Sequence, residues 1–214
     1  MTQNTLTSPC SFRSSLLLYL ALTSIATSLL ISQHATAAPE QGYKITKSAE
    51  RIKVDHKLFK LYFVMRTAEQ MAAFYYARGF SEAMVQATKK VCFITVGMGN
   101  KSKNKIWLDI REWKFDDATG PLIRYDRAYW FALWKKMKSP LRFQSTFRWT
   151  LIPTILDYQA GEREGGNITL QRRNKPFRIT AMVRPDNDKN STPIKVIINN
   201  VKCLDSKTNK RSKK

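Results

Sequence analysis

Few side chains in this sequence have the type and spacing that catalysis requires. The chain has two histidines, His34 and His56, and His34 lies in a segment that we expect to be removed. A Ser-His-Asp or Cys-His site would therefore have to be built around His56 alone. His56 stands between Asp55 and Lys57 in a polar stretch, which favours an exposed histidine without a catalytic role. We predict no catalytic residues and a protein that is not an enzyme.

Carboxylates offer the alternative chemistry. Asp109 and Glu112 are the best-placed pair for general acid–base catalysis, and Asp116 and Asp117 follow closely. However, Asp109 alternates with apolar residues on a predicted strand, and the others flank a predicted turn. The chain has 37 Lys and Arg against 16 Asp and Glu, so salt bridges are the simpler interpretation. A carboxylate-dependent extracytoplasmic hydrolase is retained as the alternative function.

No complete metal or cofactor motif is present. Residues 186–190 begin like a calcium-binding loop, but Ser191 and Ile197 occupy the positions of its glycine and its bidentate glutamate. The sequence contains no phosphate-binding loop and no dinucleotide-binding fingerprint. We predict no metal and no cofactor, and we interpret 186–190 as a polar hairpin loop and 161–166 as a turn between strands.

The formal net charge of +21 is the strongest functional signal. Such a charge concentrates polyanions at a protein surface. The candidate residues for an anionic contact are Trp134, Lys135, Lys136, Arg142 and Arg148. The competing interpretation is that Trp130 and Trp134 seal the sandwich core and that the lysines are solvated. We expect the partner to be an unknown protein or an anionic envelope component, and peripheral membrane contact and nucleic acid stay open.

The N-terminal residues indicate export. Residues 15–31 carry no charge and follow Arg13, and Ala35 and Ala37 occupy the small-residue positions of a signal peptidase site. We predict a signal peptide over residues 1–37 and a periplasmic or secreted mature protein. An uncleaved membrane anchor is the alternative, although the apolar run is short for a span. The leader contains one arginine and no acid, so the positive charge belongs to the mature chain.

Cysteine usage fits this compartment. Removal of the leader takes away Cys10 and leaves Cys92 and Cys203, an even number in an oxidising environment. We predict that Cys92 and Cys203 form a disulfide that closes most of the mature chain into one loop. The alternative is a pair of buried free thiols, because the sequence does not show that the two Cα atoms are close enough.

The first part of the mature chain is predicted to be a polar segment followed by a helical one. Residues 38–54 are predicted to be a polar tether, and 55–90 a helical segment that packs on the domain that follows. Thr67–Gln70 has the form of a capping box, and Ser81 suits a second helix start. The run 58–65 fits helix or strand, and we expect helix.

Past residue 90 the hydrophobic period becomes that of strands. Residues 91–98 and 106–110 are separated by a polar turn, which predicts a hairpin. Residues 124–138 have helical spacing and end before Ser139-Pro140, which predicts an inserted amphipathic helix. The alternation over 141–151 predicts a strand with Arg142 and Arg148 on its outer face. Further strands are expected over 168–170, 177–183 and 194–201, followed by a basic disordered tail over 205–214.

This series of short strands with intervening turns favours an antiparallel sandwich over residues 91–204. The motifs Cys92-Phe-Ile-Thr-Val, Asn100-Lys-Ser, Trp107-Leu-Asp-Ile, and Gly161-Glu through Gly165-Gly166 to Phe177-Arg-Ile-Thr-Ala resemble bacterial extracytoplasmic immunoglobulin-like β-sandwich domains of unassigned function. The resemblance covers residues 91–203 and implies architecture alone. The expected fold is mainly β with α, an immunoglobulin-like sandwich preceded by a helical segment and carrying one inserted helix.

Together these patterns predict a non-enzymatic secreted or periplasmic binding or accessory module whose basic surface contacts an anionic partner. The hydrolase is the alternative. A further alternative is a protein that lies on a membrane surface through its basic, tryptophan-containing helix at 130–138.

Overall fold

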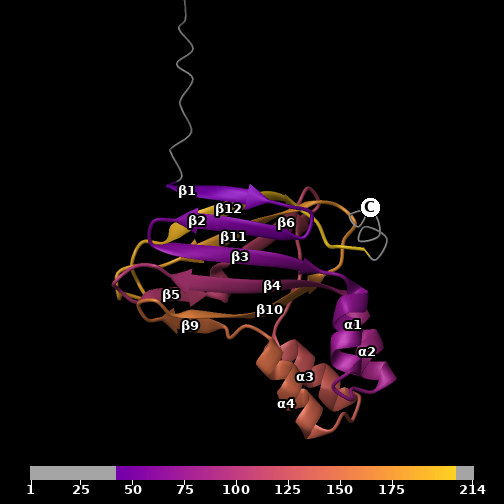
Figure 1. The fold of residues 1–214 in the computed structure, drawn as a ribbon. Coiled ribbons are helices and arrows are strands. Elements are labelled where there is room, and N and C mark those ends of the chain that lie inside the picture. Colours follow the sequence, from indigo (N-terminus) through magenta and orange to yellow (C-terminus); the bar gives the residue numbers. More distant parts are fainter. Residues whose placement is uncertain (1–41, 206–214) are drawn as a thin grey trace, which may run out of the picture. The chain divides into compact units, whose positions relative to one another are not determined.

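The computed structural model describes residues 42–205, which form antiparallel sheets and four α-helices (Figure 1). The strands are β1 (Tyr43–Lys47), β2 (Arg51–His56), β3 (Phe59–Arg66), β4 (Val91–Asn100), β5 (Ile106–Asp109), β6 (Lys114–Asp117), β7 (Gly120–Pro121), β8 (Arg124–Tyr125), β9 (Ile155–Tyr158), β10 (Arg163–Gln171), β11 (Phe177–Val183) and β12 (Ile194–Val201). The helices are α1 (Ala68–Tyr76), α2 (Glu82–Lys89), α3 (Arg127–Lys136) and α4 (Leu141–Thr150), with a 3₁₀ turn η1 (Ile110–Glu112). None of these helices has the length and apolar character that a membrane crossing requires.

The predicted tether is wrong where the structure describes it. β1 and β2 form an antiparallel hairpin in register from Tyr43↔His56 to Lys47↔Ile52. Ile52 and Val54 are buried on one side of β2, and this alternation stabilises the hairpin as the edge of a sheet. The predicted signal peptide (1–37), residues 38–41 and residues 206–214 lie outside the described residues.

The prediction of a helix over 58–65 is also wrong, because β3 occupies this segment. Phe59, Leu61, Phe63 and Met65 are buried in alternation with half-buried residues, as a strand requires. The helical prediction is confirmed for α1 and α2. At the start of α1, Thr67 Oγ1 accepts from the Gln70 backbone N–H at 3.1 Å, and the Thr67 N–H donates to Gln70 Oε1 at 3.0 Å.

The strands form three sheets with the orders β1-β2-β3-β4-β10-β8, β12-β11-β6-β7 and β5-β9. The predicted hairpin of β4 with β5 is wrong, since β4 pairs with β3 and β10 whereas β5 pairs with β9. The two larger sheets share one hydrophobic core, to which the first contributes Phe63 and Ile94 and the second contributes Ile179 and Ile198. Burial of these side chains is the main stabilising contribution of the β layer.

A second core lies between the helices and the opposite face of the six-stranded sheet. Cys92 and Ile94 of β4 belong to the first core, whereas Val91 and Phe93 belong to the second, because successive strand residues point to opposite faces. The four helices gather at one end of the strands (Figure 1). Trp134 is 1% exposed within this core. It is therefore not available to a partner on the outer surface. The helical tryptophans are core residues as interpreted, but the core that they seal is this second one and not the core between the sheets.

Segment 141–151, predicted as a strand, is helix α4. Pro140 precedes the helix, and Phe143 and Phe147 lie four residues apart on the side that faces the second core. Leu141 and Trp149, which the strand alternation would have buried, are 76% and 80% exposed. The predicted inserted helix is confirmed as α3. Asp126 caps its start, and the Asp126 carboxylate accepts from the Tyr129 N–H at 2.9 Å.

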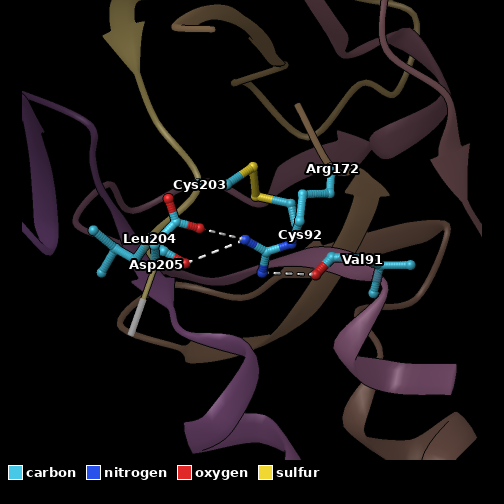
Figure 2. The surroundings of a disulfide bond; sticks show 6 residues. All are labelled: Val91, Cys92, Arg172, Cys203, Leu204 and Asp205. Atoms are coloured by element: carbon cyan, nitrogen blue, oxygen red, sulfur yellow. Dashed lines mark hydrogen bonds and ion pairs between the residues drawn. A yellow bond between two sulfur atoms is a disulfide. The ribbon is translucent and has the colours of Figure 1, made fainter. Parts of the chain in front are cut away.

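The predicted disulfide between Cys92 and Cys203 is present, with the two Cα atoms 5.5 Å apart. Figure 2 shows Arg172 beside it. The guanidinium of Arg172 donates to Val91 O at 3.3 Å and to Asp205 Oδ1 at 3.0 Å. The disulfide and this arginine together hold the segment after β12 against the start of β4.

Candidate functional site

The basic residues proposed from the sequence do not form one surface. Lys135 and Lys136 lie at the end of α3. Arg142 and Arg148 lie on different sides of α4: Arg142 borders a hollow with Arg78, while Arg148 borders a cavity between α3 and α4. The prediction that Arg142 and Arg148 project from one strand face is wrong, because their segment is helical and successive positions point in different directions.

A larger concave site lies on the outer face of β3, β4 and β10, with a volume of about 920 Å³. We call it the sheet groove. Its wall and floor contain the basic residues Lys60, Arg66, Lys101 and Arg163, the aromatic residues Tyr62, Phe74 and Trp149, and the glycines Gly97, Gly99, Gly165 and Gly166. This volume lies in the range of ordinary ligand sites.

At two of the four glycines in the sheet groove, the neighbouring backbone leaves no room for a side chain. A Cβ at Gly165 would fall far inside contact distance of the Val96 carbonyl oxygen. A Cβ at Gly166 would lie 2.5 Å from Ile152 N, where the chain after α4 crosses β10. Such close approach between backbones is a typical role of glycine in a strand. At Gly165 and Gly166, β10 therefore packs directly against neighbouring backbone.

Two cations face each other across this floor. The register places Lys60 of β3 and Arg163 of β10 on either side of Gly99. Within residues 42–205, neither Lys60 nor Arg163 takes part in an ion pair. Glu164 supplies the carboxylate in the groove lining. Lys101 forms a salt bridge with Asp55, with 2.9 Å between Lys101 Nζ and Asp55 Oδ1. The groove therefore carries a positive charge that is not neutralised internally.

Hydrogen bonds fix the end of the groove nearest the helices. Arg66 Nε donates to Thr95 Oγ1 at 3.0 Å, and the Thr95 hydroxyl donates to Asn167 Oδ1 at 2.8 Å. Nearby, Tyr75 and Thr150 share a hydrogen bond of 2.7 Å between their hydroxyl groups. Burial raises the pKa of the Tyr75 phenol, so it stays protonated and is available as a donor. These contacts hold α1 and α4 to the rim and keep Arg66 in place.

Trp149 provides an aromatic face at the groove. It projects from α4, is largely exposed, and lines the groove together with Phe74 of α1. Its ring is 80% exposed and lies at a concave site that also contains cations. Next to cations, such a ring can stack on a planar or ring-shaped part of an anionic ligand.

The carboxylates of the alternative hydrolase are committed to structural contacts. Asp109 accepts from Arg111 Nε at 2.9 Å and from the Arg111 backbone N–H at 2.9 Å, which begins η1. Glu112 pairs with Arg184 at 2.8 Å. The hydrogen bonds and charge of Arg111 hold the pKa of Asp109 below its usual value, so this carboxyl is ionised near neutrality and poorly suited to act as an acid.

His56 is buried, and the prediction of an exposed histidine is wrong. It is 7% exposed and stacks on Phe59 with ring centroids 4.7 Å apart. Its Nδ1 accepts from the Leu58 N–H at 3.2 Å. Burial lowers the pKa of His56, and the positive charges of Lys57 and Lys101 add to this effect. These contacts are those of a structural side chain.

The remaining motifs are loops. Asp186 and Asn187 adopt positive φ angles between β11 and β12, which confirms the hairpin loop. Gly161 lies in the turn before β10, whereas Gly165 and Gly166 lie within that strand, so the predicted turn is too long. Within residues 42–205, no group of three or more His, Cys, Asp or Glu side chains is placed to hold a metal ion.

Comparisons of the chain with protein-family models, curated proteins and solved structures found no match. The resemblance to immunoglobulin-like domains therefore stays a prediction, and the fold carries no function with it. The groove itself supplies the evidence for function. Sequence reasoning missed it, although the pair Gly165-Gly166 is a typical sign of a close backbone approach when it lies inside a strand.

Proposed function

We propose that this protein is a non-enzymatic binding protein that holds an acidic polysaccharide in the sheet groove. The observation that carries the proposal is the pair Lys60 and Arg163, two cations on either side of Gly99 that form no ion pair within residues 42–205. Such a pair attracts sulfate or carboxylate groups more strongly than scattered surface lysines do, because the two fields add over a concave floor.

The form of the groove supports an extended ligand. It crosses three strands, its floor is backbone, and Trp149 stands beside it. A chain of rings with repeated negative charges would place one ring on Trp149 and its anionic groups near Lys60 and Arg163. The predicted signal peptide favours a polysaccharide of the envelope or the surroundings over a nucleic acid.

We further propose that the protein acts outside the cytoplasm after cleavage behind Ala37. The disulfide between Cys92 and Cys203 supports this location, because such bonds persist in oxidising compartments. Mass spectrometry of the exported protein is expected to give a chain that begins at Ala38. A cytoplasmic chain that retains residues 1–37 would contradict the proposal.

Heparin serves as the probe for the groove. We expect it to bind the intact mature chain with an affinity that falls steeply as salt rises. Trp149→Ala is expected to weaken binding by about tenfold, since stacking on an aromatic side chain contributes about 1–3 kcal/mol. Tyr76→Ala is the control, because Tyr76 is 67% exposed on α1 but does not line the groove. Equal effects of the two substitutions would contradict the placement of the ligand.

A further inference from the structure

A second cavity lies between α3 and α4 and shares no lining residue with the sheet groove. Its volume is about 240 Å³. Phe131 and Leu141, which are 56% and 76% exposed, give it an accessible apolar surface, and Arg127 and Arg148 belong to its lining. An apolar cavity of about 150 Å³ is enough to hold a benzene molecule. The cavity between the helices therefore accepts a small ring or a short acyl chain.

The two arginines at this cavity have no counter-charge. Arg127 is half-buried and donates to the Leu151 carbonyl oxygen at 2.7 Å, while Arg148 is exposed. In the part of the chain that the structure describes, neither forms an ion pair. Burial, together with the charge of Arg148, lowers the pKa of Arg127. An anion bound between the two arginines would offset the cost of burying the charge of Arg127 and the repulsion between the two guanidinium groups.

The wall of the cavity also contains buried polar atoms without partners. Within residues 42–205, these atoms include Arg127 Nε, Trp134 Nε1 and Gln144 Oε1. The first two are donors that lack an acceptor, which is uncommon for buried groups. Trp130 provides the contrast, because its indole N–H donates to Thr169 Oγ1 at 2.8 Å. Arg127 therefore keeps a hydrogen-bonding capacity that the described part of the protein does not satisfy.

We propose that the cavity between α3 and α4 binds a small monocarboxylate with an apolar body. The ring or acyl chain packs against Phe131 and Leu141, and the carboxylate lies at Arg127 and Arg148. This site is independent of the sheet groove and of the polysaccharide proposed there.

The test compares a carboxylate with its neutral counterpart. The intact mature protein is titrated by calorimetry with 3-phenylpropionate and with 3-phenylpropanamide. The carboxylate is expected to bind at least about tenfold more tightly, as charge-assisted hydrogen bonds contribute about 1.5–3 kcal/mol. Absence of binding by both compounds, or equal affinity for them, would overturn the proposal.

Two variants locate the ligand. Arg148→Gln is expected to remove the preference for the carboxylate, whereas Arg142→Gln on another side of α4 is expected to keep it, with the same change in net charge. Ser145→Phe, which adds a ring at an exposed position of the lining, is expected to abolish binding. Unchanged affinity in Ser145→Phe, or equal losses in the two arginine variants, would place the ligand elsewhere. Heparin affinity is measured in parallel and reports on the sheet groove alone. The two arginine variants are expected to have equal affinities for heparin.

Discussion

Arg163 lies across Gly99 on the neighbouring strand, with its Cγ 3.3 Å from the position that a Cβ at Gly99 would occupy. The aliphatic part of the arginine thus rests on bare backbone, and Lys60 flanks the same glycine from the other side. Because residue 99 has no side chain, Lys60 and Arg163 can both lie over the same part of the groove floor. The charge of the groove depends on this glycine as much as on the basic residues.

Gly99→Val is expected to weaken heparin binding several-fold. The added methyl groups displace the Arg163 side chain and fill part of the floor. Gly97→Ala is the matched control, because the atom nearest to its new Cβ is Glu164 O at 4.0 Å. Fluorescence anisotropy with labelled heparin measures both affinities. Native affinity in a folded Gly99→Val protein would contradict the role of this glycine.

Gly165→Ala is expected to lower the free energy of unfolding by about 2 kcal/mol, because overpacking costs about 1–3 kcal/mol. Its Cβ would collide with the Val96 carbonyl oxygen and push β10 away from β4. Urea denaturation followed by circular dichroism gives the value. Gly97, directly opposite Gly165 in the register, again supplies the control. If Gly97→Ala and Gly165→Ala lose equal stability, the clash is not the cause.

The pH dependence of stability is expected to reflect His56. Burial lowers its pKa in the folded state below the ordinary value of about 6.5. As pH falls through that value, the unfolded chain takes up a proton before the folded chain does, so the free energy of unfolding decreases. Urea denaturation at pH 7.5 and at pH 5.5 should show this loss in the native protein and a smaller one in His56→Gln. Parallel behaviour of the two proteins would exclude His56 as the source.

Removal of the disulfide is expected to lower the free energy of unfolding by about 4 kcal/mol on the chain-entropy account. Cys92 and Cys203 are separated by 111 residues, so the bond restricts most of the mature chain. The double variant Cys92→Ser, Cys203→Ser and the reduced native protein should show equal losses in urea denaturation. Two reactive thiols in the unfolded, unreduced mature protein would show that the bond is absent.

Local patterns in the sequence were sufficient for several elements and misleading for others. The capping residues Thr67 and Ser81 correctly located α1 and α2, because a cap depends on the next three residues alone. The alternation at 141–151 suggested a strand, but Phe147 is buried against aromatic residues of α1 and α3, and this packing selects the helix. Tertiary contacts of this kind are not visible in the local period.

The candidate site was less accessible to sequence reasoning. Lys60 and Arg163 are brought together only because β4 pairs with both β3 and β10, and this order of strands is not encoded in any single segment. The misassignment of 58–65 as helix removed Lys60 from any sheet. The basic residues chosen instead, such as Arg142 and Arg148, were clustered in sequence but point to different sides of α4.

The most direct test of the groove compares two double variants that change the net charge equally. Lys60→Ala, Arg163→Ala removes the groove cations, and Lys189→Ala, Lys195→Ala removes two exposed lysines outside the groove. In heparin titrations at fixed salt, the affinity of the groove variant is expected to fall about tenfold or more, because charge-assisted contacts are lost. The affinity of the control variant is expected to change little. Equal losses in both variants would show that heparin responds to the overall charge of the protein and not to the sheet groove.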